Sequence, residues 1–112
     1  MNIQIFGTKK CFDTKKAERY FKERGLKFQK IDLVQKGLSP GELKSITQTI
    51  GLENLINKDS PNYKESVIAY TEDIVTIQEI LLASPKLLKT PIVRNGKKAT
   101  VGYQPDIWKA WE

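Results

Sequence analysis

The sequence predicts an α/β fold built on a four-stranded mixed sheet, with a helical insert between its first and last parts. Three observations predict this fold: strand-type segments flank an amphipathic helix near the N-terminus, helical signals dominate the middle, and a hairpin signal precedes a short closing helix. The 112 residues are 39% hydrophobic and 29% charged, which is typical of a globular chain. We therefore expect one domain over residues 1–112.

The N-terminal part is expected to form a strand–helix–strand unit. Apolar and polar residues alternate over residues 2–6, as in a first strand. A helix follows to about Arg24, with Asp13 or Thr14 as its N-cap, and Lys27–Val34 has the pattern of a second strand. Because the connections are short, the unit should be a right-handed crossover between parallel strands.

The middle of the chain, about residues 35–88, is expected to be an all-helical insert. Its clearest signal is Ser39-Pro40-Gly41-Glu42, a capping box with proline at the first helical position. A second long helix is expected from about Glu72 to Ala83, with Thr71 as its cap. The residues expected on its inner face are Ile74, Ile77, Ile80 and Leu81.

The last part is expected to form a hairpin and a helix. Asn95-Gly96 is a strong two-residue turn signal, between a strand that follows Thr90-Pro91 and a return strand at Ala99–Val101. Gln104–Glu112 should form the closing helix. The side chains available to dock this helix are those of Ile107, Trp108 and Trp111. Together the βαβ part, the insert and the ββα part make a thioredoxin-like topology.

Composition excludes several classes of function. The chain has no histidine, which removes Cys–His and Ser–His catalysis and nearly all zinc sites, so no metal site is expected. The net charge of +6 comes mostly from dispersed lysines, so we expect no nucleic-acid partner but rather an anionic substrate or an acidic protein. Without a spanning apolar run or a signal-peptide pattern, we expect a cytoplasmic protein and no membrane partner.

Cys11 is the single cysteine and the main candidate for chemistry. It directly precedes a helix, where free N–H groups and the positive end of the helix dipole favour a thiolate. Lys15 lies one turn along on the same side, and Lys10 precedes the cysteine, so both could supply positive charge. The alternatives are a small buried core cysteine and ordinary exposed lysines.

Several short motifs, in this order, resemble one known family. Cys11 follows the first strand, Lys15 lies four residues on, and the large helical insert comes next. Leu87–Val93 is then similar to the segment L-[IL]-[KR]-R-P-[IV]-[IVL], and Val101–Tyr103 to V-G-[FY]. Over essentially its whole length the chain resembles the arsenate reductase C (ArsC), Spx and YffB group of thioredoxin-like proteins.

The resemblance implies roles for particular residues. Cys11 would be the nucleophile. Thr14 stands where the C-x-x-C or C-x-x-S pattern has its last residue, and it could hydrogen-bond the thiolate of Cys11. Pro91 would be a cis-proline lying against the cysteine, with the backbone of Thr90 free to pair with an extended substrate; a trans-proline at the start of an edge strand is the alternative. Lys89 would add positive charge nearby.

The implied function is that of a monothiol thiol–disulfide oxidoreductase. Because the chain has no second cysteine, an external thiol must release each adduct, either a small thiol such as glutathione as co-substrate or a thioredoxin-type protein. No bound cofactor is implied. The alternatives are a regulator resembling Spx, which would bind RNA polymerase without turnover, and a thioredoxin-fold module without thiol chemistry.

Arsenate itself is not the expected substrate. The glutathione-using arsenate reductases of the group hold the oxyanion with three arginines. The matching positions of this chain are Asn57 or Lys58, Thr90 beside Lys89, and Gly102 or Tyr103. None of them is arginine, whose planar fork binds oxyanions through two hydrogen bonds.

Overall fold

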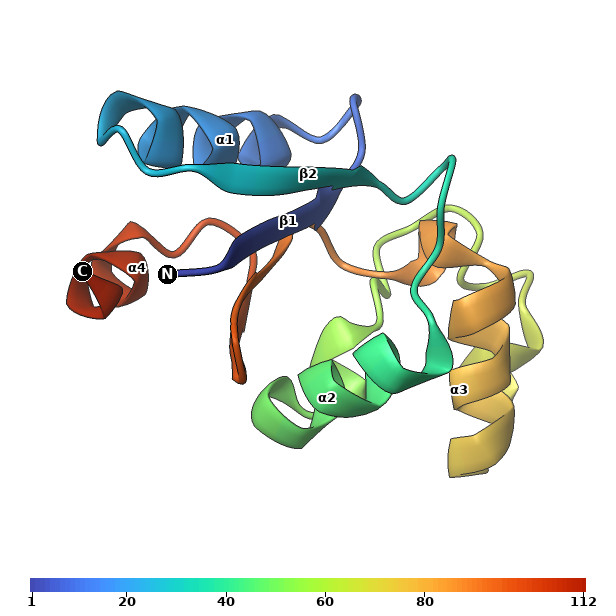
Figure 1. The fold of residues 1–112 in the computed structure, drawn as a ribbon. Helices are drawn as coiled ribbons and strands as arrows, with labels where there is room; N and C mark the ends of the chain where they lie inside the picture. The colour runs from blue at the N-terminus through green and yellow to red at the C-terminus, as the bar shows by residue number, and fades with distance from the viewer.

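The computed structural model describes all of residues 1–112 and has a four-stranded mixed sheet at its centre. The strand order is β2-β1-β3-β4 (Figure 1). β1 (Ile3–Gly7) pairs in parallel with β2 (Phe28–Asp32) and antiparallel with β3 (Ile92–Asn95), which pairs antiparallel with β4 (Lys98–Val101). The expected thioredoxin-like arrangement is therefore confirmed.

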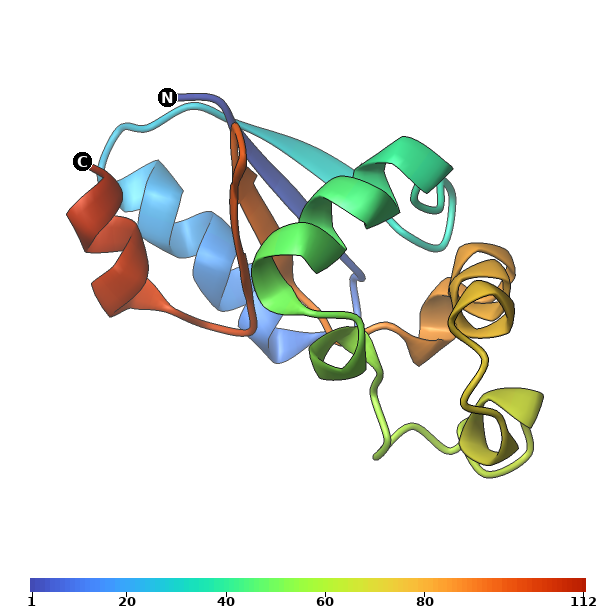
Figure 2. The same ribbon diagram turned by 90° about the horizontal axis from the view of Figure 1, so that it is seen from below.

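The two faces of the sheet carry separate apolar clusters, because side chains alternate along each strand. Ile3 and Ile5 of β1 pack with residues of α1 (Phe12–Glu23) and α4 (Pro105–Trp111). Phe6, on the other face of β1, packs with residues of the insert. Figure 2 shows α1 and α4 on one side of the sheet and α2 on the other.

The insert between β2 and β3 is helical, as expected. It contains α2 (Pro40–Ile50) and α3 (Ile74–Ala83), with shorter 3₁₀ turns at Glu53–Leu55, Val67–Tyr70 and Pro85–Leu87. The predicted capping box of α2 is confirmed. The N–H of Glu42 donates to Oγ of Ser39 at 3.1 Å, and the N–H of Ser39 donates to Oε1 of Glu42 at 2.9 Å.

The start of α3 differs from the prediction. The helix begins at Ile74, and its N-cap is Asp73, whose carboxylate accepts the N–H of Thr76 at 3.1 Å. Thr71, the expected cap, instead accepts the N–H of Asp73 at 3.2 Å and so shapes the turn before the helix. Ile74 was expected inside but is 62% exposed, because it lies at the first helical residue, past the core formed by Ile77 and its neighbours.

Two smaller details, the end of β2 and the hairpin turn, also differ from the prediction. β2 ends at Asp32, two residues early, because the Asp32 carbonyl accepts the N–H of Gln35 at 3.1 Å and starts a turn. In the hairpin the residues between the paired Asn95 and Lys98 are Gly96 and Lys97, so the expected Asn-Gly centre shifts by one residue. Only Gly96 has a positive φ, 62°, which matches a turn that requires this conformation at its first central residue.

Only one of the three candidate docking residues of the closing helix α4 is completely buried. Trp108 is completely buried, and its Nε1–H donates to Oγ1 of Thr100 at 2.8 Å. Trp111 packs only partly against the same cluster, and Ile107 is 45% exposed, so the expectation that Ile107 docks the helix is wrong. None of the helices combines the length and the apolar character that crossing a bilayer requires.

Candidate active site

Cys11 is itself the N-cap of α1, in place of the expected Asp13 or Thr14. Its backbone is extended, with φ −88° and ψ 115°, and its carbonyl oxygen accepts the N–H of Lys15 at 3.3 Å as the first helical hydrogen bond. The sulfur is only partly buried. It therefore stays available at the helix start, where free N–H groups face it.

The second element of the site is the segment before β3. The Thr90–Pro91 peptide bond is cis, which decides between the two alternatives left by the sequence. The thiol of Cys11 donates to the carbonyl oxygen of Thr90, with Sγ and O 3.6 Å apart. Pro91 is buried, whereas Thr90 is half-buried. Cysteine and cis-proline segment therefore lie side by side, as the resemblance implied.

Hydrogen bonds favour the thiolate form of Cys11. Burial of the sulfur is the largest single effect and raises the pKa, but four hydrogen bonds oppose it. They come from the side chains of Thr14 and Thr90 and from the backbone of Thr14 and Asp13, and together they lower the pKa below its ordinary value. A lowered pKa at a partly exposed sulfur is the property expected of a reactive cysteine.

Thr14 faces into the structure from the first turn of α1. It is 4% exposed, and its buried hydroxyl oxygen has no regular hydrogen-bond partner. Ionisation of Cys11 gives this buried hydroxyl an acceptor, which explains why it lowers the pKa of the cysteine. A buried hydroxyl without a hydrogen-bond partner costs free energy, so the thiolate of Cys11 also stabilises the hydroxyl of Thr14 by accepting its hydrogen bond.

Gly7 is a site residue that the sequence analysis missed. A methyl group built on Gly7 would overlap both the methyl and the hydroxyl of Thr14. Only glycine therefore lets the first turn of α1 approach β1 this closely. The signal in the sequence was a glycine at the end of the first strand, which by itself reads as an ordinary turn residue.

The lysines are arranged differently from the sequence-based expectation. Lys15 is exposed, and its ammonium lies 5.9 Å from the centre of the Phe12 ring. Hydrogen bonds, rather than this lysine, account for the lowered pKa of Cys11. Lys10 and Lys89 are also exposed.

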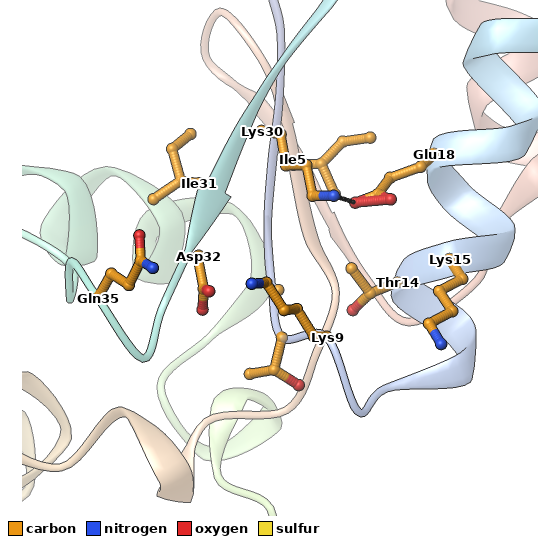
Figure 3. Close-up of a pocket in the computed structure, with 11 residues that line it drawn as sticks. Ile5, Lys9, Thr14, Lys15, Glu18, Lys30, Ile31, Asp32 and Gln35 are labelled. Atoms are coloured by element: carbon orange, nitrogen blue, oxygen red, sulfur yellow. Dashed lines mark ion pairs between the residues drawn. The ribbon is translucent and has the colours of Figure 1, made fainter.

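A polar groove of about 530 Å³ lies beside the site, between α1 and β2. Thr14 and Lys15 line it from α1, and Lys30 and Asp32 from β2, as Figure 3 shows. Lys30 pairs with Glu18 at 3.4 Å across it. The sulfur of Cys11 does not line this groove and points instead toward Thr90.

The positions that match the arginine cage do not form one here. Asn57 lies next to the cis-proline segment, because its N–H donates to the carbonyl of Leu87 at 2.8 Å. The adjacent Lys58 is paired with Glu53. This chain has three arginines in all, and two of them bind other groups. Arg24 pairs with Glu112 at 3.4 Å, and Arg94 donates to Gln4 and Ser45 at 3.3 Å.

The sheet topology, the cysteine at a helix start and the cis-proline beside it define the class: this is a protein with a thioredoxin-like fold. The model of the ArsC family matches residues 6–111. The chain therefore belongs to the ArsC family.

Relatives in the family carry two kinds of name. "Global transcriptional regulator Spx 2" of Oceanobacillus iheyensis is 29% identical over 95% of this chain and 80% of its own length. "Regulatory protein MgsR" of Bacillus subtilis is 26% identical over 92% of this chain and 84% of its own length. An arsenate reductase from Vibrio cholerae superimposes with a TM-score of 0.83 at 22% identity, covering 96% of this chain and 94% of that one, and so shows the same fold.

Proposed function

We propose that this protein is a monothiol thiol–disulfide oxidoreductase in which Cys11 is the nucleophile. The observation that carries the proposal is the sulfur held 3.6 Å from the carbonyl of Thr90, beside a cis-proline, with its pKa lowered by hydrogen bonds. Thiolates, not thiols, attack disulfides. A partly exposed sulfur that ionises readily suits that step.

The reaction consists of two exchanges. In the first, the Cys11 thiolate attacks one sulfur of a substrate disulfide, the S–S bond breaks, and the other sulfur leaves as a thiolate that takes up a proton from solvent. In the second, an external thiolate attacks the mixed disulfide and releases Cys11 as a thiolate. The external thiol is a small thiol such as glutathione or a thioredoxin-type protein, since the chain holds no second cysteine.

The remaining site residues hold the sulfur and the substrate. Thr14 and Thr90 stabilise the thiolate between exchanges, because both hydrogen-bond it. The resemblance to the family implies that the backbone of Thr90 pairs with an extended substrate. Lys10, Lys15 and Lys89 are exposed cations that attract anionic substrates to this end of the sheet.

Turnover with a small disulfide tests the proposal. The wild-type chain should reduce a mixed disulfide of glutathione and a simple alkyl thiol, with excess glutathione as reductant. Cys11→Ser should reduce it no faster than the uncatalysed background. Thr47→Ser, a change in α2 that adds or removes no sulfur, serves as the control. Equal rates with and without Cys11 would contradict the proposal.

A second function has its own support. Two relatives carry the names of regulators, Spx 2 and MgsR, and the resemblance to Spx implies binding to RNA polymerase without turnover. A retention assay with purified RNA polymerase α subunit separates the two functions. Retention at moderate salt by both wild type and Cys11→Ser, with no disulfide turnover, would favour the regulator over the enzyme.

A further inference from the structure

The later part of the helical insert, residues 51–84, differs in charge from the rest of the protein. Residues 51–84 contain six acidic and two basic side chains, a net charge of −4, whereas the remaining residues carry +10. Three of these carboxylates, Glu65, Glu72 and Glu79, are exposed and form no ion pair within the chain. The chain therefore presents an acidic region at one end of a basic molecule.

The same region exposes an unusual number of large apolar side chains. Val67, Tyr70, Ile74 and Val75 are 63%, 81%, 62% and 59% exposed, within nine residues of sequence. The core of the insert does not use them, since buried neighbours such as Ile68 and Ile77 fill it. Apolar side chains that gather on a surface without serving the core mark an interaction site.

One of these side chains, Ile74, lines a groove of about 560 Å³, which we name the insert groove. Its apolar wall is formed by Leu52, Ile56, Tyr63, Ile68, Ala69, Ile74 and Ile77. Glu53 and Glu72 line the same groove. Figures 1 and 2 place α3 and the yellow-green segment before it away from α1 and α4.

We propose that the insert groove docks a basic amphipathic segment of a partner protein. Apolar side chains of the segment would fill the groove, and its lysines or arginines would meet Glu72, Glu53 and the neighbouring carboxylates. The groove is apolar, Glu72 lines it without an ion-pair partner, and residues 51–84 carry a net charge of −4. This combination selects a basic occupant, because an acidic segment would be repelled and an uncharged one would gain no electrostatic attraction.

Two peptides test the charge preference. The probe is a 14-residue amphipathic peptide of leucine and lysine at helical spacing, and its matched control keeps the leucines and replaces every lysine by glutamate. Titration of the isotope-labelled full chain by NMR should give saturable amide shifts in residues 52–78 with the lysine peptide, weakening as salt rises. The glutamate peptide should leave those amides unchanged.

Paired variants place the contact. Ile74→Ser and Glu72→Lys, both at residues that line the groove, should each weaken binding of the lysine peptide at least fivefold. Their controls, Val34→Ser at a side chain 74% exposed elsewhere and Glu23→Lys at the end of α1, should leave it within twofold. Cys11→Ser should also bind normally, so failure of the thiol chemistry and failure of this docking site are separate results.

Three results would overturn the inference. They are shifts confined to residues outside the groove, equal binding of the glutamate peptide in the groove, and self-association whose contact lies in the groove. Sedimentation of the unliganded chain at several concentrations detects the last of these.

Discussion

The sulfur of Cys11 lies 3.6 Å from the carbonyl oxygen of Thr90, although 79 residues separate them in sequence. The sheet brings them together, since Phe6 of β1 pairs with Ile92 of β3 and each residue of the site follows or precedes one of these strands. The helical insert lies between β2 and β3 and adds no strand to the sheet. Both halves of the candidate active site therefore depend on one pair of antiparallel strands.

Thr14→Val should slow the reaction of Cys11 with a neutral alkylating agent at pH 7. The change keeps the buried shape of residue 14 but removes a hydroxyl that lowers the pKa of the cysteine. A hydrogen bond to a charged group contributes about 1.5–3 kcal/mol, so the rate should fall roughly tenfold or more. Thr14→Ser keeps the hydroxyl and should react nearly as fast as wild type; equal rates for the valine and serine variants would refute this role.

Gly7→Ala should act on the same thiol from a distance. The added methyl group would overlap Thr14, so α1 must shift. The hydroxyl of Thr14 would then lose its position beside the sulfur of Cys11. We expect slower alkylation and a loss of about 1–3 kcal/mol in unfolding free energy, as for other overpacked sites. Gly41→Ala is the control, because a methyl there meets nothing within 4 Å. Urea denaturation and alkylation kinetics measure both effects.

Lys15→Gln separates long-range attraction from activation of the thiol. Lys15 is exposed, and its ammonium lies by the Phe12 ring. Alkylation by neutral iodoacetamide should change less than about twofold, as expected for a screened surface charge. Alkylation by anionic iodoacetate should fall several-fold at low salt. A large loss of alkylation rate with iodoacetamide would contradict this and would show that Lys15 helps to ionise Cys11.

Ser39→Ala should destabilise the fold without touching the site. Both hydrogen bonds of the capping box would be lost or weakened, at a cost of about 1 kcal/mol in unfolding free energy. Urea denaturation measures this loss. Turnover with a small disulfide should stay at the wild-type level, since the box lies at the start of α2, and a fall in turnover would show that the insert reaches the thiol site.

Local signals predicted most of the fold. Alternating residues predicted the first strand, and the capping box predicted the start of α2. The predicted start of α3 was wrong because two nearby residues could each serve as the N-cap. Thr71 and Asp73 both precede α3, and the aspartate caps it because its carboxylate reaches the N–H of Thr76.

At the candidate site, the helix start and Thr14 lower the pKa of Cys11 as expected from the sequence, whereas Lys15 does not contribute. Sequence spacing had made Lys15 a candidate source of positive charge for Cys11, because side chains four apart share a helix face. The direction of a long flexible side chain cannot be read from spacing, and this one lies by Phe12. Gly7 could not be identified either, since its role depends on a close contact between a strand and a helix.

The pH profile of Cys11 alkylation tests the central claim most directly. The rate follows the thiolate fraction, so a lowered pKa moves the midpoint to lower pH. With iodoacetamide the rate should rise and reach its plateau at a pH below that of an unperturbed thiol, whose pKa is about 8.5. A profile whose midpoint coincides with that of a free cysteine, or lies above it, would contradict the account.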